Sequence, residues 1–298
     1  MAVTYDYYRI FYYVAKYQSF TRAAKILMSN QPNITRAMNN LERELACRLF
    51  IRSNRGVTLT PEGKKLFDHV QIAQEQLQAG EYELSGKRNL EEGNVAISAS
   101  ETALHGLLLP VLQQFHLVWP GIRIQIHNHS TPQAVAAVKS GLVELAVVTS
   151  PTGAARTLRE VRLKKIREIL IAGKHFEELA KRRISIKELT EYPLVCLGRE
   201  TKTYEFYSQI FSQYGAILHP DIEAATADQI LPMVRYDLGL GFLPDSLAKE
   251  ALEEGEVFQV ELKETIPSRY ICLIKDSGRP LSLAAKELEK LIRGAGDL

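Results

Sequence analysis

Apolar side chains recur at the spacing of short amphipathic helices over the first 45 residues. One predicted helix carries its apolar stripe at Ile10, Phe11, Val14 and Ala15. A second carries Ala23, Ala24 and Leu27. A third carries Ile34, Met38, Leu41 and Leu45. This periodicity predicts three consecutive helices, each with one buried face.

Polar residues mark where the second and third helices begin. Ser19 or Thr21 can cap the second helix, since a short side-chain oxygen accepts a free backbone N–H. Asn30 can cap the third helix in the same way. Pro32 follows in its first turn, where the missing N–H of proline costs little.

The exposed face of the third helix carries groups that can bond base edges and phosphates in a major groove. They are Gln31, Asn33, Thr35, Arg36 and Asn39. Arg48, Arg52 and Arg55 follow, with Gly56 before an apolar segment, which predicts a short β-hairpin wing along the phosphate backbone. The alternative is a plain three-helix bundle whose polar face is only solvated.

Charge is distributed unevenly along the 298 residues. The first 60 hold nine Lys or Arg against three Asp or Glu, which makes this part near +6. The whole chain is +2, so the remainder is near −4. A positive field at one end is what phosphate binding requires.

A long helix is predicted after Pro61, to about residue 88. Its apolar positions are spaced by four and three residues in turn: Leu66, Val70, Ala73, Leu77, Gly80 and Leu84. This is a coiled-coil seam, which favours pairing with a second copy. The alternative is an amphipathic helix lying on its own domain. Residues 86–93 are expected to form a hinge.

From Val95 onward short apolar strands alternate with helices, which predicts a mostly parallel sheet with helices on both faces. A second unit of this kind is expected from about Val161. Predicted strands are 95–99, 122–126, 145–148, 169–172, 194–197, 222–224, 240–243 and 270–274. Predicted helices include 175–182, 204–214, 229–236 and 284–292.

Hydroxyl and basic residues follow several of these strands. Ligands of open α/β sheets bind beyond the carboxyl ends of the strands, near helix N-termini. The candidate ligand residues are Ser100, Thr102, Thr131, Thr149, Arg199, Thr201 and Thr226. Arg199 suits an anion, whereas Glu101 opposes one, so the ligand's charge stays open. The alternative for each Ser or Thr is a simple helix cap.

The N-terminal pattern resembles the LysR-type transcriptional regulators. The resemblance rests on Ala23-Ala24, Leu27, Asn30-Gln31-Pro32, Thr35, Leu41-Glu42, Leu45-Ala46, Leu49-Phe50-Ile51-Arg52 and Leu59-Thr60-Pro61-Glu62-Gly63. Asn30, Asn33 and Ala46 stand where the family usually has Ser, Ala and Gly. The resemblance implies DNA-binding roles for Gln31, Pro32, Asn33, Thr35, Arg36, Asn39, Arg52 and Arg55.

The resemblance extends more weakly to the C-terminal half, through pieces such as Trp119-Pro120 and residues 239–244. It implies a multidomain α+β protein: a winged helix-turn-helix at 1–60, a linker and dimerisation helix at 61–92, and an effector domain at 93–298. That domain would resemble periplasmic solute-binding proteins, with lobe 1 at about 93–161 and 267–298 and lobe 2 at about 162–266. Promoter DNA, a small-molecule effector, RNA polymerase and a homodimer or homotetramer are the implied partners.

Other chemistry has little support in the sequence. His127 and His129 share one side of a strand, with His105 nearby, but no carboxylate or cysteine stands at metal-ligand spacing, so no metal is expected. Neither a cofactor nor a catalytic constellation is expected. Cys47, Cys196 and Cys272 are widely spaced, as in reduced cytoplasmic proteins. No secretion signal and no membrane span are predicted.

Three functions remain to be compared. A ligand-responsive transcription factor explains every feature above. A solute-binding protein explains only the C-terminal half, and it leaves the basic N-terminal module without a role. An enzyme with a DNA-binding extension lacks acid, base or metal groups. Binding to upstream DNA separates the first from the other two, and a turnover assay would reveal the third.

Overall fold

The computed structural model describes residues 3–53, 56–84 and 93–296, and the chain divides into two compact units. The first unit is Met1–Arg88 and the second is Asn89–Leu298. Each unit is described by itself below.

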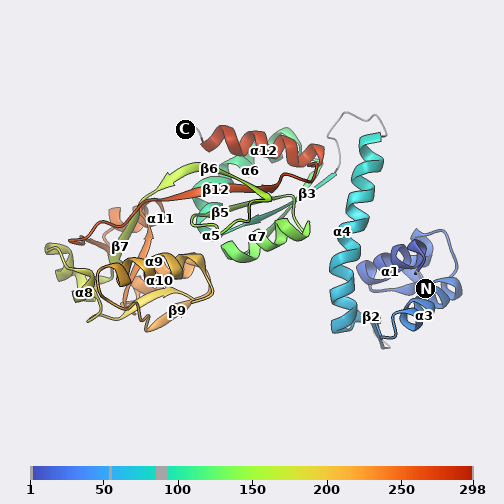
Figure 1. Ribbon diagram of the computed structural model, residues 1–298, viewed down its shortest axis with the longest axis horizontal. Coiled ribbons are helices and arrows are strands. Elements are labelled where there is room, and N and C mark those ends of the chain that lie inside the picture. Colours follow the sequence, from blue (N-terminus) through green and yellow to red (C-terminus); the bar gives the residue numbers. More distant parts are fainter. Residues whose placement is uncertain (1–2, 54–55, 85–92, 297–298) are drawn as a thin grey trace. The chain divides into compact units, whose positions relative to one another are not determined.

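The first unit is a helix-turn-helix followed by a hairpin and a long helix (Figure 1). Its elements are α1 (Tyr5–Tyr17), α2 (Phe20–Ile26), α3 (Gln31–Glu44), β1 (Phe50–Ser53), β2 (Gly56–Leu59) and α4 (Pro61–Leu84). The two strands are antiparallel, with Phe50 opposite Leu59. The predicted helices and wing are therefore confirmed.

Caps and core explain why these residues form these helices. Ser19 Oγ accepts the N–H of Arg22, and Asn30 Oδ1 accepts the N–H of Asn33 at 2.9 Å. Of the two candidate caps for the second helix, Ser19 is therefore the one used. The predicted apolar stripes meet in one core that includes Phe11, Val14, Ala23, Ala24, Ile34, Met38 and Leu41.

Three non-glycine residues of this unit, Gln18 after α1 among them, have a left-handed backbone conformation. Met28, between α2 and α3, has a φ of 51°, and Ala46, after α3, has a φ of 52°. In this region a residue with a Cβ atom has a conformational energy about 1–2 kcal/mol less favourable than glycine has. The turn at Ala46 therefore keeps a conformation suited to glycine although the residue is alanine.

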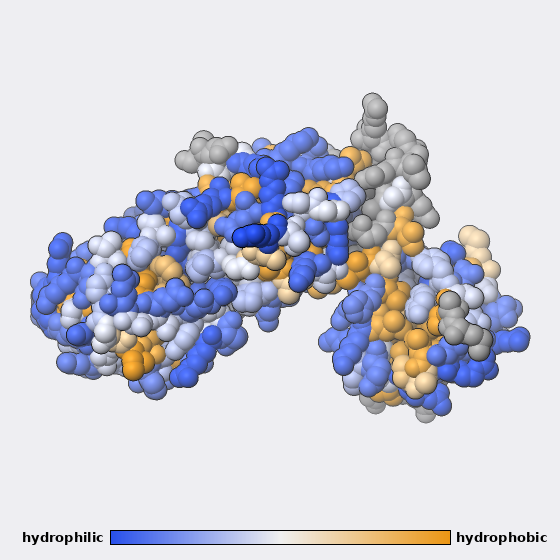
Figure 2. Space-filling view, in the orientation of Figure 1, coloured by the Kyte–Doolittle hydropathy of each residue, from blue (hydrophilic) through white to orange (hydrophobic). Residues whose placement is uncertain are grey.

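The linker helix α4 packs on its own unit, which is one of the two interpretations that its sequence allowed, and its pairing with a second copy stays a prediction. Its first half packs on its own unit, because Leu66, Phe67 and Val70 join the core around α1. Tyr5 also donates a hydrogen bond to the buried Gln74 at 3.1 Å. Farther along, Leu77 is 47% exposed, and apolar surface appears on this unit in Figure 2. Most other side chains of the second half of α4 lie outside the described residues, so a seam for pairing stays a prediction there.

The second unit contains two five-stranded sheets, one in each lobe (Figure 1). The first sheet has the order β4-β3-β5-β12-β6. Its strands are β3 (Gly93–Ala99), β4 (Ile122–Asn128), β5 (Leu145–Thr149), β6 (Leu158–Ile166) and β12 (Arg269–Asp276). Strands β3, β4 and β5 are parallel, whereas β12 runs antiparallel to both β5 and β6.

Helices cover both faces of the first sheet, as predicted. They are α5 (Glu101–Ala103), the π-helical turn η1 (Leu104–Leu108), α6 (Leu109–Val118), α7 (Thr131–Ser140) and α12 (Leu283–Gly296). One core lies between the sheet and the α6/α12 side, and a second lies under α7 (Figure 1). The carboxyl ends of β3 and β5 are left next to the helix starts at Ser100 and Ser130.

The second sheet has the order β11-β7-β10-β8-β9. Its strands are β7 (Glu168–Ala172), β8 (Leu194–Leu197), β9 (Ile222–Ala224), β10 (Leu240–Pro244) and β11 (Phe258–Val260). Its helices are η2 (Lys174–Lys181), α8 (Ile186–Leu189), α9 (Lys202–Gln213), η3 (Ala227–Gln229), α10 (Ile230–Arg235) and α11 (Asp245–Glu253). Cores on both faces of this sheet complete the lobe.

The eight predicted strands of this unit are confirmed, and β6 and β11 were not predicted. β6 carries five charged residues in nine, because only its two ends are fully buried. Such a half-exposed strand has no continuous apolar run to reveal it. Because β6 stays in the first sheet to Ile166, the chain passes into the second sheet at Arg167, whereas the sequence suggested a position near Val161.

Candidate functional site

The recognition face of α3 is well exposed. Gln31, Pro32, Asn33, Arg36 and Asn39 are exposed, and Thr35 is half-buried. Thr21 of α2 donates a hydrogen bond to Gln31 Oε1 at 3.1 Å, which orients that amide. The helix therefore presents amide, hydroxyl and guanidinium groups together, the set that reads base edges.

The wing is fixed to α3 by a buried carboxylate that the sequence did not reveal. Glu42 is 7% exposed, and its Oε1 accepts the backbone N–H groups of Leu49 at 2.7 Å and Phe50 at 3.2 Å. Arg48 donates to Oε2 at 3.3 Å. The family pattern marked Glu42, but helical periodicity shows only a polar residue between buried ones. The carboxylate determines where the wing strand begins relative to the recognition helix.

Of the predicted wing arginines, the backbone of Arg52 lies in β1, opposite Val57. The side chain of Arg52 and the whole of Arg55 lie outside the described residues. Their contact with phosphates stays a prediction.

Three of the predicted effector residues are neighbours at the carboxyl ends of β3 and β5. The N–H of Ser100 donates to Val147 O at 3.1 Å, and Thr131 Oγ1 donates to Thr149 O at 3.4 Å. Thr102, the second residue of α5, is buried. Ser100 Oγ is buried, and it has no hydrogen-bond partner among the described residues. A buried hydroxyl without a partner is costly, so this oxygen is poised for a ligand or a water molecule.

The predicted residues of the second lobe are less closely grouped. Thr201 caps α9, because it accepts the N–H of Tyr204 at 3.1 Å and donates to Gly198 O at 2.8 Å. Arg199 is 64% exposed in its side chain and lies 3.5 Å from Glu223. Thr226 precedes η3, which packs against α5 of the first lobe. Thr201 thus has the cap role that was the alternative, and the structure brings Thr226 toward the first lobe.

The lobe junction is organised by a buried ion pair that the sequence did not indicate. Arg269, the first residue of β12, lies 3.1 Å from Glu168, the first residue of β7, and their side chains are 3% and 1% exposed. Arg269 also donates to Ser150 O at 2.6 Å, Thr149 Oγ1 at 2.8 Å and Thr203 Oγ1 at 3.0 Å. One guanidinium therefore holds the end of β5 in the first lobe and the start of α9 in the second.

Two aromatic residues of α9 complete this network. Phe206 lies 5.1 Å from the Arg269 guanidinium carbon, measured from the ring centroid. Tyr207 donates to Glu168 Oε2 at 2.8 Å. Burial, and then the nearby Glu168 charge, raise the pKa of Tyr207 well above its usual value. Tyr207 therefore stays protonated and serves as a permanent donor to the carboxylate.

Little in the amino-acid sequence indicates this network. Arg269 and Glu168 each stand at the start of an apolar strand, where a charged residue is normally at the surface. No feature of the neighbouring residues distinguishes a surface charge at a strand start from a buried charge whose partner is 101 positions away.

The histidine pair forms a separate feature. The rings of His127 and His129 are stacked with centroids 5.8 Å apart, and Ser98 Oγ lies 2.7 Å from His129 Nδ1. Burial, and then the neighbouring His127, lower the pKa of His129. His105 instead lies 2.9 Å from Glu101. The described residues contain no group of three or more His, Cys, Asp or Glu that could hold a metal ion.

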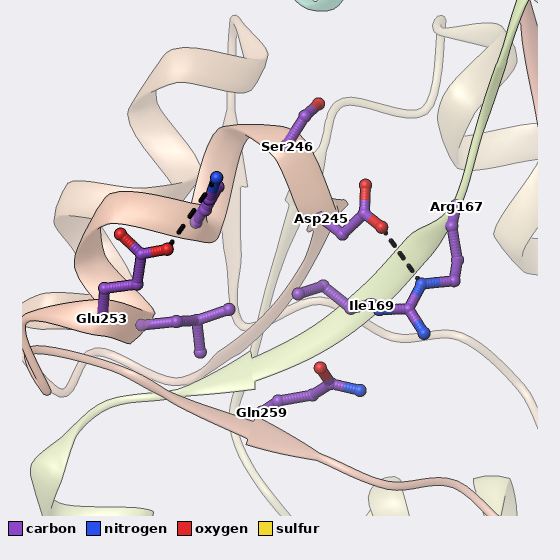
Figure 3. A pocket seen from close by; sticks show the side chains of 8 residues that line it. Arg167, Ile169, Asp245, Ser246, Glu253 and Gln259 are labelled. Atoms are coloured by element: carbon purple, nitrogen blue, oxygen red, sulfur yellow. Dashed lines mark hydrogen bonds and ion pairs between the residues drawn. The ribbon is translucent and has the colours of Figure 1, made fainter.

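A groove of about 450 Å³ lies on the second lobe and contains none of the predicted effector residues. Figure 3 shows Arg167 pointing at Asp245 across its upper edge, with Ile169 and Gln259 below. Arg167 and Asp245 lie 3.1 Å apart, and Lys249 and Glu253 lie 3.9 Å apart. Because each charge has an opposite partner, the groove has no net preference for a charged ligand.

Two of the three cysteines are buried. Burial raises the pKa of Cys196 to about 12 and that of Cys272 to about 12. Both thiols therefore stay protonated near neutral pH, as core residues do. Cys47 is half-buried in the first unit.

A winged helix-turn-helix with an exposed recognition face, followed by a two-lobed α/β unit, defines a DNA-binding regulator with a ligand-sensing domain. Residues 5–64 match the family of bacterial regulatory helix-turn-helix proteins of the lysR type, and residues 88–297 match the LysR substrate binding domain. The chain therefore belongs to the LysR family of transcriptional regulators.

Curated relatives and solved structures agree with this assignment. The uncharacterized HTH-type transcriptional regulator YvbU of Bacillus subtilis is 26% identical, and the match covers 96% of this chain and 98% of that protein. A probable RuBisCO transcriptional regulator of Porphyra purpurea is also 26% identical, with 97% and 93% covered. A full-length OxyR variant from Pseudomonas aeruginosa shares the fold, with a TM-score of 0.68, 20% identity and 100% and 96% covered.

The regulator CbnR in complex with its target DNA also shares the fold, with a TM-score of 0.68, 16% identity, and 98% and 99% of the two chains covered. In the described part of this chain, no helix has both the length and the hydrophobicity to cross a membrane.

Proposed function

We propose that this regulator binds promoter DNA as a homodimer or homotetramer and responds to a small anionic effector at the lobe junction. The observation that carries the effector site is the buried Ser100 Oγ, which has no partner among the described residues and lies beside the strand end that holds Thr149. The family consists of transcriptional regulators, so we propose no catalytic activity and a location in the cytoplasm, together with the DNA.

The DNA contact would be made by Gln31, Pro32, Asn33, Thr35, Arg36 and Asn39 of α3, with Arg52 and Arg55 along the backbone. The exposure of the α3 residues and the positive charge of the first 60 residues support this assignment. Two such heads, paired through the exposed part of α4, would reach half-sites about one helical turn of DNA apart. The CbnR complex with DNA shows that one protein of this fold binds DNA as a full-length chain.

The effector would bind through Ser100, Thr102, Thr131, Thr149, Arg199, Thr201 and Thr226. Ser100, Thr131 and Thr149 carry most of this proposal, since the structure groups them at two adjacent strand ends. The helix starts of α7 and α9 add partial positive charge. Effector binding would shift the balance between lobe arrangements and thereby alter the spacing or angle of the paired heads. RNA polymerase is a further proposed partner.

The test of DNA recognition is an Arg36→Ala variant in a gel-shift assay on the DNA upstream of its own gene. We expect about tenfold or greater loss of affinity, since a base-contacting arginine contributes roughly 1–3 kcal/mol. Arg9→Ala removes the same charge from an exposed position of α1 and is the matched control. Equal losses in both variants would contradict specific recognition by α3.

The test of effector control compares DNA footprints with and without small anions, using the wild-type protein and Thr149→Val. We expect an anion to change the footprint length or the pattern of enhanced cleavage, and Thr149→Val to weaken this response. A footprint that no tested anion changes would count against the anionic effector.

A further inference from the structure

Two hydroxyl groups at the lobe junction have defined hydrogen-bond roles, and a buried arginine determines these roles. We propose that Arg269 is a positioning residue for the effector: it uses the hydroxyl oxygens of Thr149 and Thr203 as acceptors and so leaves both hydroxyl protons to be donated to an anionic group. This inference rests on the proposed effector site and adds two residues to it: Thr203 as a second donor, and Arg269, which does not itself bind the effector.

The donor and acceptor roles follow from the chemistry of the guanidinium and hydroxyl groups. A guanidinium has only donors, so the oxygens of Thr149 and Thr203, 2.8 Å and 3.0 Å from Arg269 Nη2, must both be acceptors in these bonds. Each hydroxyl keeps one proton to donate. Across the described ranges of the chain, no hydrogen bond donated by either hydroxyl is found. The pair is therefore left as two donors.

The two donors are close enough to serve one small ligand. Both oxygens lie within 3.0 Å of the same nitrogen, so their separation is less than the sum of two hydrogen bonds. Thr149 ends β5 of the first lobe and Thr203 belongs to α9 of the second. A carboxylate or sulfate bonded to both would bridge the lobes beside Arg269.

Arg269 itself is not available as the anion receptor. Its charge is matched by Glu168 at 3.1 Å, and both side chains are almost fully buried. Four of its five N–H groups are used by Ser150, Glu168, Thr149 and Thr203. Tyr207 on Glu168 and Phe206 against the guanidinium hold the pair in place. The arginine thus acts through the hydroxyls that it orients.

The consequence is selectivity for acceptor groups. Each hydroxyl can donate its proton to a carboxylate, sulfate or phosphate oxygen, whereas an ammonium group of a ligand would have only the second lone pair of each oxygen to bond, because Arg269 uses the first. An effector with a negatively charged group is therefore preferred at this point of the junction, although the ion pair itself has no net charge.

The experiment measures binding of sulfate, acetate and malonate to the full-length protein by calorimetry. Arg269→Lys keeps a cation beside Glu168, but a single ammonium does not reproduce the fork that reaches both threonines. We expect about tenfold weaker anion binding, the value of roughly one hydrogen bond to a charged group. Arg162→Lys is the matched control, because Arg162 of β6 lies over the Tyr270 ring, outside the network.

A double-mutant cycle separates this role from general support of the fold. If Arg269 acts through the hydroxyls, Arg269→Lys should change anion affinity less than twofold when Thr149 and Thr203 are already valine. A tenfold loss that persists in that background would overturn the proposal, because the effect would then not pass through the hydroxyls.

The remaining outcomes are equally decisive. If the wild type binds an anion and Arg269→Lys binds it equally well, the role of Arg269 is overturned and the effector site stands. If none of the three anions binds the wild type, the anionic effector is overturned together with this role. If Arg269→Lys does not fold, two variants of Thr203 are measured instead. Thr203→Ser keeps the hydroxyl and must bind the anion as the wild type does, and Thr203→Val must bind it about tenfold more weakly. Equal anion affinities of these two variants would overturn the proposal.

Discussion

In each unit of this protein a buried glutamate organises a functional region, and these two glutamates differ in how far along the chain their partners lie. Glu42 accepts backbone N–H groups seven and eight residues later in the chain. Glu168 pairs with Arg269, 101 residues later. The DNA-binding head is thus organised by a local contact, whereas the lobe junction depends on strands that meet only in the folded domain.

The partners also differ in exposure. Arg48, the cation beside Glu42, is 81% exposed in its side chain, and Arg269 is 3% exposed. An exposed ion pair is screened by water and contributes little, while a buried pair leaves an uncompensated charge when one member is lost. Equivalent substitutions in the two regions should therefore have very different effects.

The largest contrast concerns thiol chemistry. We expect iodoacetamide at pH 8 to modify Cys47 in the folded protein and to leave Cys196 and Cys272 unmodified. With a pKa raised to about 12, each buried thiol stays almost entirely protonated at that pH. Mass spectrometry of the labelled peptides is the measurement, and labelling after unfolding is the control. Rapid labelling of Cys196 in the folded state would contradict the burial of this thiol.

Removal of the buried arginine should have the next largest effect. Arg269→Ala leaves the Glu168 charge buried without a counter-ion, which costs about 3–5 kcal/mol in the free energy of unfolding of the second unit. Trp119, the single tryptophan, lies in this unit, so its fluorescence during urea unfolding reports the loss. The double variant Arg269→Met with Glu168→Leu should recover most of the stability. If Arg269→Ala lowered the free energy of unfolding by less than about 1 kcal/mol, the buried ion pair of the second unit would not differ from the exposed pair of the first as proposed.

The local carboxylate should matter less, and its exposed partner least. Glu42→Ala leaves two buried backbone N–H groups without an acceptor, which costs roughly 2–3 kcal/mol in the first unit. Arg48→Ala should cost under about 1 kcal/mol, because that side chain is largely in water. Hydrogen exchange of peptides within residues 3–53 measures the loss of stability in both variants. Equal effects of the two substitutions would mean that the ion pair, and not the backbone contact, holds the wing.

The smallest predicted effect on stability concerns Ala46 and Asp237, two residues with a left-handed backbone conformation. Ala46→Gly should stabilise the first unit by about 0.5 kcal/mol, since relief of strain at a φ of 52° exceeds the entropy cost of glycine. Asp237 in the second unit has a φ of 58°, but its Oδ1 accepts the N–H of His175 at 2.8 Å. Asp237→Gly should therefore destabilise. Thermal unfolding of the two variants compares them, and the same sign for both would contradict this explanation.

Much of the architecture was predictable because its signals are local. The caps at Ser19 and Asn30, the apolar stripes of three helices and the apolar strands of both lobes each depend on neighbours within about ten residues. The strands that escaped prediction, β6 and β11, are partly exposed and carry no such signal. For the candidate site, the hydroxyls at Ser100, Thr131 and Thr149 were predicted from strand ends, and the structure groups them.

The sequence by itself determined the family, the exposed recognition face of α3 and the placement of hydroxyls after strands, since these follow from periodicity, caps and motif spacing. Only the tertiary structure decided that Glu42 anchors the wing and that Arg269, Glu168, Thr149 and Thr203 form one network. The physical reason is that burial and partner choice of a charged side chain depend on which distant strands become neighbours. A charged residue at a strand start looks the same in sequence whether water or a buried carboxylate will face it.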